Sequence, residues 1–289
     1  MIKQKINYLI RSAINIGQQK KCPFCGGERL VKIDGKFIFT SLLDCDTCKL
    51  NHRHPKDNEK WLKQFYQKDY KIDTHMMTKL LTDDEIKRNK ENNFSSLRSY
   101  DNYINAIFKK KGGVKIIDYG CSWGYNVYKL IKSGFLCVGY ELSVPRAEFG
   151  KLKLEIPIHS DIKQLPTEND LFLSSHVIEH LSDIDEFISL SKKYLKNDGV
   201  FMAFCPNGSL PYRNREPYIW HVNWGFLHPN YLSIAFAKYA FRENPYLIIT
   251  GDWSFNADQL SNWDGLSQVV GSYQEGKELL IISKPNIKI

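Results

Sequence analysis

Residues 114–126, VKIIDYGCSWGYN, decide the fold of this chain. A short apolar run ends at Asp118 and passes through a turn that contains Gly120 and Gly124. The residues that follow repeat apolar side chains at the spacing of one helix face. Because a buried strand that turns through glycines into a helix is the opening unit of a parallel sheet, this stretch predicts an α/β fold.

Further apolar runs of the same kind follow, and helical periods separate the first five of them. The strand candidates are 114–120, 136–142, 156–161, 170–177, 200–206, 246–250 and 278–285, and the helix candidates are 123–133, 144–154 and 183–196. Continuous apolar strands that alternate with helices predict a seven-stranded, mostly parallel sheet with helices on both faces. The last two strands have no helical period between them, which predicts an antiparallel pair at the edge.

Two Cys-x-x-Cys pairs precede this region. The pair Cys22 and Cys25 is separated by 19 residues from the pair Cys45 and Cys48, a spacing typical of a structural zinc site with four thiolates. The intervening segment LVKIDGKFIFT predicts a β-hairpin that turns at Asp34-Gly35. The sequence therefore predicts a small zinc ribbon.

Other residues near the cysteines, and the overall composition, bear on the metal ligands, the compartment and the partner of the protein. His52 and His54 offer imidazole in place of one thiol, but four thiols already close a tetrahedral shell, as in a structural metal site. The three remaining cysteines are scattered, which indicates metal binding in a reducing compartment and hence a cytoplasmic protein. The net charge of +8 comes mostly from lysines spread along the chain, so a solvated surface is favoured over a nucleic-acid partner.

The first residues have the pattern of an amphipathic helix. Isoleucine and leucine recur at helical spacing over residues 2–16, with basic residues between them. The apolar stripe is narrow and lacks Trp and Phe, so docking onto the same protein is favoured over a membrane surface. No apolar run in the sequence approaches the ~20 residues that span a bilayer.

Acidic residues end three successive predicted strands, at Asp118, Glu141 and Asp161. A carboxylate at the end of the second strand can accept hydrogen bonds from both ribose hydroxyls of a nucleotide-like cofactor. Any one of these residues alone is more often a helix cap or a solvated turn residue. Their joint placement, in register with the glycine turn, indicates a cofactor site.

The segment Asp118-x-Gly120-x-x-x-Gly124, with these acidic positions, resembles the first motifs of class I S-adenosylmethionine-dependent methyltransferases. The resemblance implies a Rossmann-like fold that binds S-adenosylmethionine and releases S-adenosylhomocysteine. The cofactor-binding residues that it implies are Asp118, Gly120, Ser122, Gly124, Glu141, Leu142, Asp161, Ile162 and Ser175. An NAD-binding domain is the nearest alternative, but it would require a glycine where Ser122 stands.

The resemblance covers roughly residues 20–250. The segment CDTCKLNHRHPKDNEKWLKQFYQKDY looks like part of the zinc-ribbon methyltransferases of sugar and surface-glycan pathways, and YLKNDGVFMAFCPN looks like their fifth-strand hairpin. The parts that it implies are an N-terminal helix (1–20), a zinc ribbon (21–60), a helical connector (61–112) and a methyltransferase domain (113–289).

Histidines are the candidate general bases for methyl transfer, because imidazole titrates near neutral pH and the acceptor must lose a proton. His176 follows the fourth predicted strand directly and is the first candidate, and His221 is the second. His180 and His228 are further candidates. For each of them a structural hydrogen bond is an equal alternative.

The string HVIEH, residues 176–180, also matches a zinc-peptidase signature. A zinc site of that kind requires both histidines on one face of a helix. Ser182 and Asp183 predict a helix that begins only after this string. We therefore interpret HVIEH as a strand end and loop, and expect the metal on the cysteines.

An aromatic segment, residues 207–228, is expected to form a loop-like lid over the carboxyl ends of the strands. Arg213 and Arg215 are candidates to hold a phosphate, and Trp220 and Trp224 are candidates to stack on a sugar. A packed lid with solvated arginines is an equal alternative.

The residues after the fourth strand bear on the acceptor. Ser174-Ser175-His176-Val177 differs from the Asn/Asp-Pro-Pro-aromatic string of many methyltransferases that act on amino groups. We therefore expect an oxygen or carbon acceptor in a small molecule or glycan, such as a phosphate-containing nucleotide-linked sugar or a surface-glycan intermediate. The alternatives are an RNA methyltransferase whose ribbon binds RNA, and a catalytically inactive scaffold that binds the cofactor.

Overall fold

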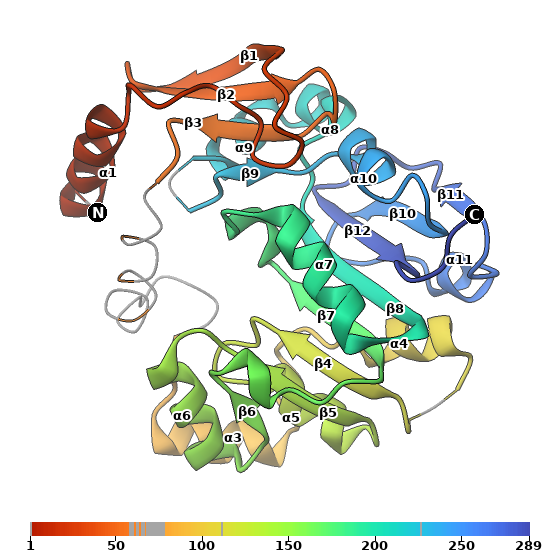
Figure 1. Ribbon diagram of the computed structural model, residues 1–289. Helices are drawn as coiled ribbons and strands as arrows, with labels where there is room; N and C mark the ends of the chain where they lie inside the picture. The colour runs from red at the N-terminus through yellow and green to blue at the C-terminus, as the bar shows by residue number, and fades with distance from the viewer. Residues whose placement is uncertain are drawn as a thin grey trace.

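The computed structural model describes residues 2–57, 61, 64, 67, 79–110, 112–225 and 227–289, with the backbone alone at 2–7. Within these residues the chain forms an eight-stranded sheet and a separate four-stranded sheet (Figure 1). The strands of the large sheet are β4 (Lys115–Tyr119), β5 (Leu136–Tyr140), β6 (Ile158–His159), β7 (Asn169–Ser175), β8 (Leu195–Pro206), β10 (Tyr246–Gly251), β11 (Gln268–Val270) and β12 (Glu278–Ser283). Their order is β11-β10-β12-β8-β7-β4-β5-β6.

All seven predicted strands are present, and their directions confirm the predicted α/β class. The strands β4 to β8 are parallel to their neighbours within this group, whereas β12 lies between β8 and β10 and is antiparallel to both. The short strand β11, for which the polar sequence gave no signal, adds an eighth strand at the edge. The strand order reverses at β4, because the chain adds β5 and β6 on one side and then β7 on the other.

Neighbouring side chains on the central strands point into two separate cores, one on each face of the sheet. Ile116 belongs to the first core and Ile117 to the second. The first core is covered by α3 (Asp83–Glu91), α4 (Asp101–Phe108), α5 (Tyr125–Lys132), α6 (Val144–Leu154) and α11 (Ala257–Ser261), and the second by α7 (Ile184–Tyr194), α10 (Ile234–Ala240) and the ribbon. Because both faces are covered, these strands read as continuous apolar runs.

The start of α7 confirms the interpretation of HVIEH. The side chain of Asp183 accepts a hydrogen bond of 2.8 Å from the backbone N–H of Glu186, which caps the helix. The string follows β7, which ends at Ser175: His176 and Val177 belong to no strand or helix, and the remaining residues form a short 3-10 turn, η4 (Ile178–His180). HVIEH is therefore not an α-helical zinc motif.

The four-stranded sheet consists of β1 (Leu30–Lys36), β2 (Thr40–Cys45), β3 (Asn51–His54) and β9 (Asn230–Tyr231). The predicted hairpin exists, but its predicted turn is wrong. Strand pairing continues through Lys36 and Thr40, so the chain turns at residues 37–39. Asp34-Gly35 instead lies inside β1, because the Asp34 carboxylate bonds to residues of α9 (Pro217–Asn223) and just beyond it.

The expectation of a loop-like lid at residues 207–228 is also wrong. Much of this segment is helical, in α8 (Leu210–Arg215) and α9, and it lies beside the ribbon sheet (Figure 1). Its aromatic side chains join ribbon residues in a small core made of Leu42, Tyr212, Trp220, Trp224 and Tyr231. Burial of these rings explains why the segment is ordered without a strand or a long helix of its own.

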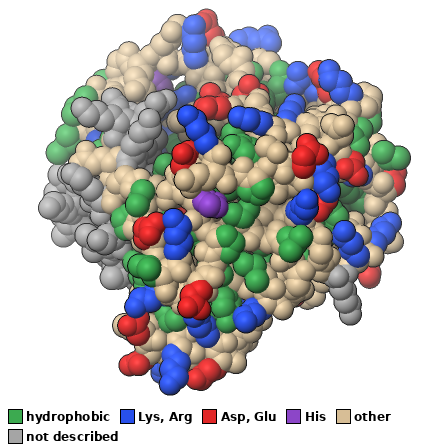
Figure 2. Space-filling view, turned by 60° about the horizontal axis from the view of Figure 1, so that its bottom comes forward, with side chains coloured by type: hydrophobic (Ala, Val, Ile, Leu, Met, Phe, Trp, Pro, Cys, Tyr) green, Lys and Arg blue, Asp and Glu red, His purple; other side chains and the backbone are tan. Residues whose placement is uncertain are grey.

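The N-terminal helix α1 (Ile2–Ile14) packs against the ribbon, as the docking interpretation predicts. The buried ring of Tyr8 lies 5.9 Å from the ring of Phe37, and Arg11 forms an ion pair of 2.8 Å with Asp57. In the part of the chain that the structure describes, no helix has the length and apolar character to cross a membrane. Figure 2 shows basic and acidic side chains interspersed over one face, with hydrophobic side chains between them.

Candidate active site

The carboxyl ends of β4, β5, β6 and β7 meet at one edge of the large sheet. The backbone N–H groups of Gly120 and Cys121 donate to the carbonyl of Tyr140, at 2.8 and 3.0 Å. The N–H of Glu141 donates to the carbonyl of His159 at 3.0 Å. In open α/β sheets ligands bind at the carboxyl ends of strands where the strand order reverses, which here is at β4.

The glycine turn keeps its path although Ser122 replaces a motif glycine. Gly120, Ser122 and Gly124 all have positive φ, at 78°, 54° and 81°. A Cβ atom at residue 120 would lie 2.3 Å from a methyl group of Val177, so only glycine fits there. Ser122 is held in the left-handed conformation because its hydroxyl accepts a hydrogen bond of 2.8 Å from the buried Arg146 guanidinium.

Glu141 is buried directly behind this turn. Its two carboxylate oxygens accept hydrogen bonds from the N–H groups of Ser122 at 2.9 Å and Ser143 at 2.7 Å. Burial raises the pKa of Glu141, and these hydrogen bonds oppose the rise. Since a carboxylate has about four lone-pair sites, it can still accept from two further hydroxyls.

Asp118 lies at the end of β4 and is also buried. Burial raises the pKa of this carboxyl to about 6, the charge of Glu141 adds to the rise, and a hydrogen bond of 3.0 Å from the Asn126 side chain opposes it. A buried acid without a cation beside it is unfavourable when ionised. A cationic ligand group at this position would restore the ionised form.

The other predicted cofactor residues lie at the neighbouring strand ends. Asp161 is exposed and accepts a hydrogen bond from the N–H of Lys163 at 3.0 Å, which starts the 3-10 turn η3 (Ile162–Gln164). Leu142 is exposed after β5, and Ser175 ends β7. The fold thus places these residues along the carboxyl edge, and their role in binding stays a prediction.

His176 follows β7 and lies between two buried carboxylates. Its Nε2 is 2.9 Å from Glu278 Oε1, and its Nδ1 is 3.2 Å from Glu179 Oε1. Burial lowers the pKa of His176, but the hydrogen bonds and charges of the two carboxylates outweigh it and raise the pKa to about 9. At neutral pH the imidazole therefore carries a proton, which suits it to orient an acceptor or bind an anion more than to act as a base.

Four residues beside His176 were not predicted from the sequence. The hydroxyl groups of Tyr100 and Ser175 share a hydrogen bond, and Arg98 forms an ion pair with Glu278. The ring of Trp253, which is 50% exposed, lies 5.6 Å from the His176 ring. Tyr100 and Arg98 come from the connector, and Trp253 and Glu278 from the last strands, so no local pattern in the sequence could link them to His176.

The residues predicted in the lid lie elsewhere. Trp220 and Trp224 are each only 1% exposed, so the expectation that their rings stack on a sugar is corrected: protein side chains cover them. Arg213 donates to the carbonyl of Ile33 in the ribbon at 3.1 Å. The segment thus fastens the ribbon to the large sheet.

The remaining lid candidates are already paired. Arg215 forms a two-pronged ion pair with Asp252, at 2.8 and 3.0 Å, which neutralises its charge. His221 Nδ1 lies 2.7 Å from the carboxylate of Asp34 in the ribbon. The structure does not bring His221 into contact with His176, and its catalytic role stays a prediction.

The four predicted metal ligands do come together. The sulfur atoms of Cys22, Cys25, Cys45 and Cys48 all lie within 4.8 Å of one another, with Cys22 and Cys48 at 3.4 Å. A tetrahedral zinc ion with Zn–S bonds of ~2.3 Å separates its sulfur ligands by about 3.8 Å, so the cluster has the size that zinc requires. The four thiolates would form a closed structural site.

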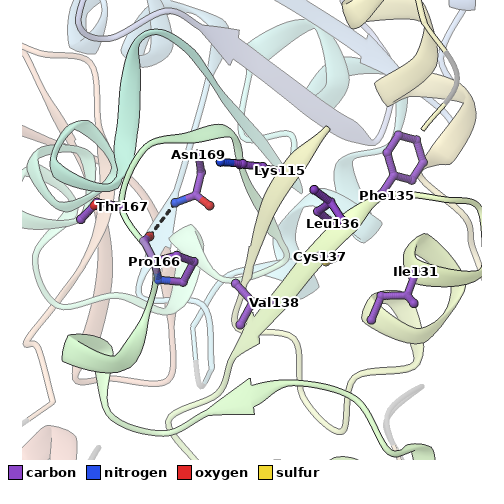
Figure 3. Close-up of a pocket in the computed structure, with 9 residues that line it drawn as sticks. All are labelled: Lys115, Ile131, Phe135, Leu136, Cys137, Val138, Pro166, Thr167 and Asn169. Atoms are coloured by element: carbon purple, nitrogen blue, oxygen red, sulfur yellow. Dashed lines mark hydrogen bonds between the residues drawn. The ribbon is translucent and has the colours of Figure 1, made fainter. Parts of the chain in front are cut away.

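A hollow of about 460 Å³ lies at the opposite, amino ends of the strands (Figure 3). Its lining includes Lys115, Leu136 and Asn169, the first residues of β4, β5 and β7. The Asn169 side chain donates to the carbonyl of Pro166 at 2.6 Å. Because cofactors of parallel sheets bind at the carboxyl ends, this hollow is not the cofactor site.

Comparisons with known proteins agree with the geometry at the carboxyl edge. Residues 117–203 match a family model described as a methyltransferase domain. The chain is 29% identical over 115 residues to a ubiquinone biosynthesis O-methyltransferase from Pelagibacter ubique (strain HTCC1062), covering 37% of this chain and 48% of that protein. A protein of the same description from Bartonella quintana (strain Toulouse) is 29% identical over 103 residues, with 32% and 42% covered. The chain thus spans about half the length of the curated relatives it matches.

Among solved structures, the chain is similar to magnesium protoporphyrin IX methyltransferase from Synechocystis PCC 6803 with bound S-adenosylhomocysteine. The identity is 13%, the TM-score is 0.48, and the match covers 78% of this chain and 99% of the other. The stretch that matches the family model runs from β4 into β8 and includes the glycine turn and Glu141. Residues 117–203 therefore match the core of a methyltransferase domain.

Proposed function

We propose that this protein transfers a methyl group from S-adenosylmethionine to an oxygen of a small-molecule acceptor. The observation that carries the proposal is the meeting of the glycine turn, Glu141 and Ser175 at the edge where the strand order reverses. The names of the curated relatives, which are O-methyltransferases, support an oxygen acceptor. So does the sequence after β7, which lacks the proline-rich string of many amine methyltransferases.

Each part of the cofactor has a candidate partner in this chain. Glu141 would accept hydrogen bonds from the ribose hydroxyls, and Asp161 with the backbone of Ile162 would contact the adenine. Asp118, whose burial without a cation is unfavourable, would lie near the amino group of the methionine part. S-adenosylmethionine supplies an electrophilic methyl group, and the protein must align it with the acceptor oxygen.

His176 would orient the acceptor rather than deprotonate it. Its two ring nitrogens face Glu179 and Glu278, which hold the imidazole in the charged form, so it would act on an anionic oxygen of the acceptor through its positive charge. An acceptor whose reacting oxygen is already ionised needs no separate base at the moment of transfer, which favours an easily ionised hydroxyl. An acceptor that carries a phosphate could be held through that group, but its reacting hydroxyl would still have to lose its proton to water or to another base.

Two classes of acceptor follow. A nucleotide-linked sugar or surface-glycan intermediate is proposed from the resemblance to zinc-ribbon methyltransferases, with a phosphate as the anionic group. An aromatic hydroxyl compound is the second candidate, because the half-exposed ring of Trp253 beside His176 offers a surface on which a flat ring can stack. Seven free cysteine thiols support the proposal that the protein works in a reducing compartment.

The cofactor assignment is tested by thermal unfolding with and without S-adenosylhomocysteine. We expect the product to raise the melting temperature of the wild type and to have no effect on Glu141→Ala, because that variant loses the ribose contacts. Glu148→Ala, which removes an exposed carboxylate of α6, is the matched control and should respond like the wild type. A wild type that shows no stabilisation would refute the cofactor assignment.

The acceptor is tested by product detection with a panel of nucleotide sugars, phenolic compounds and RNA. Methylation of a nucleotide sugar supports the first class, and methylation of a phenolic compound supports the second. Trp253→Ala should raise the KM for a phenolic acceptor with little change in kcat, because stacking contributes to binding. Methylation of RNA alone would overturn both classes.

A further inference from the structure

The buried Glu179 and the partly exposed His180 and His228 form a cluster near the end of β7. One ligand atom from each lies within 4.8 Å of the others. Glu179 and His180 belong to the 3-10 turn η4, whereas His228 comes from the end of the lid segment. The cluster therefore joins two parts of the chain that are separated by the whole of β8 and the helices α8 and α9.

The carboxylate of Glu179 is buried and has one close cationic partner. Its side chain is 0% exposed, and the charged His176 lies with Nδ1 3.2 Å from Oε1. Burial raises the pKa of Glu179, but the contact with His176 and the neighbouring histidines outweighs burial and lowers the pKa. The second oxygen, Oε2, accepts no hydrogen bond from any residue that the structure describes. A buried carboxylate normally binds a metal or several donors, so Oε2 is open to a further cation.

Both histidines present a free nitrogen to this carboxylate. His180 Nδ1 lies 2.7 Å from the carbonyl of Leu227, and His228 Nδ1 lies 2.6 Å from the carbonyl of Asn223. A carbonyl only accepts hydrogen bonds, so each Nδ1 carries a proton, and in the neutral imidazole the lone pair that can bind a metal is then on Nε2. A histidine fixed by Nδ1–H to a backbone carbonyl is the usual arrangement of a metal ligand.

The spacing fits a small divalent ion. His180 Nε2 lies 3.9 Å from Glu179 Oε1, and the rings of His180 and His228 are 4.7 Å apart between centroids. Two nitrogens and one oxygen bound at ~2.0–2.2 Å around a tetrahedral ion lie about 3.4 Å apart. The His180–Glu179 pair is therefore about half an ångström wider than in a zinc site, and all three ligand atoms lie within 4.8 Å of one another. We propose that Glu179, His180 and His228 bind a divalent first-row transition metal, with Zn²⁺ as the reference ion.

The proposed site differs from the peptidase pattern that the string HVIEH suggests. Only Glu179 and His180 of the string take part, and the third ligand, His228, comes from the lid segment. The ion would neutralise the buried carboxylate and would fasten the lid segment to the turn that follows His176. A set of two histidines and one glutamate leaves a fourth coordination position open. This inference does not depend on the proposed methyl transfer.

The site is tested by the zinc content of the full-length protein, measured by elemental analysis after removal of loosely bound metal. We expect about two zinc ions per chain in the wild type, one on the four thiolates and one on the new site. His228→Ala and Glu179→Gln should each retain about one. His159→Ala removes a histidine outside the cluster and should retain both.

Cobalt spectroscopy tests the site without any variant. When Co²⁺ replaces zinc, the four-thiolate site shows thiolate-to-metal charge transfer, whereas the new site should add visible absorption without a further thiolate band. A wild type that binds one zinc and shows only the thiolate site at excess Co²⁺ would overturn the proposal. Glu179, His180 and His228 would then be held together by hydrogen bonds and charge alone, without a metal.

Two further measurements separate the possible failures. Circular dichroism and thermal unfolding show whether His228→Ala still folds, and if it does not, the cobalt titration of the wild type decides. Binding of S-adenosylhomocysteine is followed independently. A protein that holds two metal ions but does not bind S-adenosylhomocysteine refutes the proposed function and leaves the metal site intact.

Discussion

At the scale of single residues, a pKa raised by burial marks the two acids of the cofactor site. Asp118 and Glu141 both have raised pKa values because they are buried, and each has hydrogen bonds that only partly compensate. Buried acids whose pKa stays raised are unfavourable for folding when ionised, so their presence indicates a ligand that pairs with them. Residues of this kind lower the stability of the ligand-free protein and contribute to the affinity for the ligand.

Replacement of Asp118 by Asn tests this trade. The folded pKa of about 6 lies above the ordinary value of 3.8, so this acid stabilises the fold only when protonated and costs stability as the pH rises from about 4 to 6. Asp118→Asn should therefore raise the free energy of unfolding at pH 8, by on the order of 1–3 kcal/mol. It should also weaken S-adenosylhomocysteine binding.

The measurement is denaturant unfolding of the wild type and the variant between pH 4 and 8. The difference in free energy of unfolding between Asp118→Asn and the wild type should disappear toward pH 4, where the wild-type acid is protonated. Exposed Asp198, replaced by Asn, is the matched control and should change neither stability nor binding. An Asp118→Asn protein that is less stable at pH 8 would show that the carboxylate has a stabilising partner.

At the scale of elements, one carboxylate joins the ribbon hairpin to the lid helices. The Asp34 side chain on β1 accepts a hydrogen bond of 2.8 Å from Trp224 Nε1 and lies 2.7 Å from His221 Nδ1. Burial raises the pKa of Asp34, but these hydrogen bonds outweigh it and lower the pKa below its usual value. The interaction also explains why Asp34-Gly35 is not the hairpin turn.

Asp34→Ala should destabilise the protein by about 1–3 kcal/mol, because the buried N–H of Trp224 loses its acceptor. His221→Ala should cost less, because Trp224 keeps Asp34. Thermal unfolding measures both, with Asp46→Ala on the ribbon surface as the control. Loss of methyl transfer in a stable His221→Ala protein would support the catalytic prediction for His221, and unchanged turnover would remove it.

At the scale of the whole molecule, the ribbon is part of the same packed body as the large sheet. Its strand β3 pairs with β9, and three of its cysteines lie in the core between the large sheet, α7 and α10. The ring of Phe24 contacts that of Phe236 on α10, with centroids 5.0 Å apart. The division of the chain near residues 20, 60 and 112 stays a prediction.

This packing predicts that the four-thiolate metal stabilises the whole protein. Cys45→Ser, or a strong chelator, should lower the melting temperature of the entire molecule in a single transition, because the fully buried Cys45 belongs to the shared core. Calorimetry measures the number of transitions. Two well-separated transitions, with the methyltransferase domain unchanged in the second, would contradict this coupling.

The amino-acid sequence by itself determined seven of the eight strands of the large sheet, the helices between the first five of them and the cysteines that cluster. The helix predicted at 144–154 is α6, with the same bounds, and all seven predicted strands form. Periodicity and Cys-x-x-Cys spacing act between residues a few positions apart, so they can be read locally. The same holds for the glycine turn, whose positive φ angles require small residues.

Only the tertiary structure decided the properties that depend on distant partners. The charge of His176 depends on Glu278, which lies 102 residues further along the chain. The burial of Trp224 and the hairpin turn depend on contacts between the ribbon and the lid segment, and the proposed second metal site depends on His228 lying close to Glu179. Burial, desolvation and long-range pairing are properties of the packed molecule, and a local pattern carries no information about them.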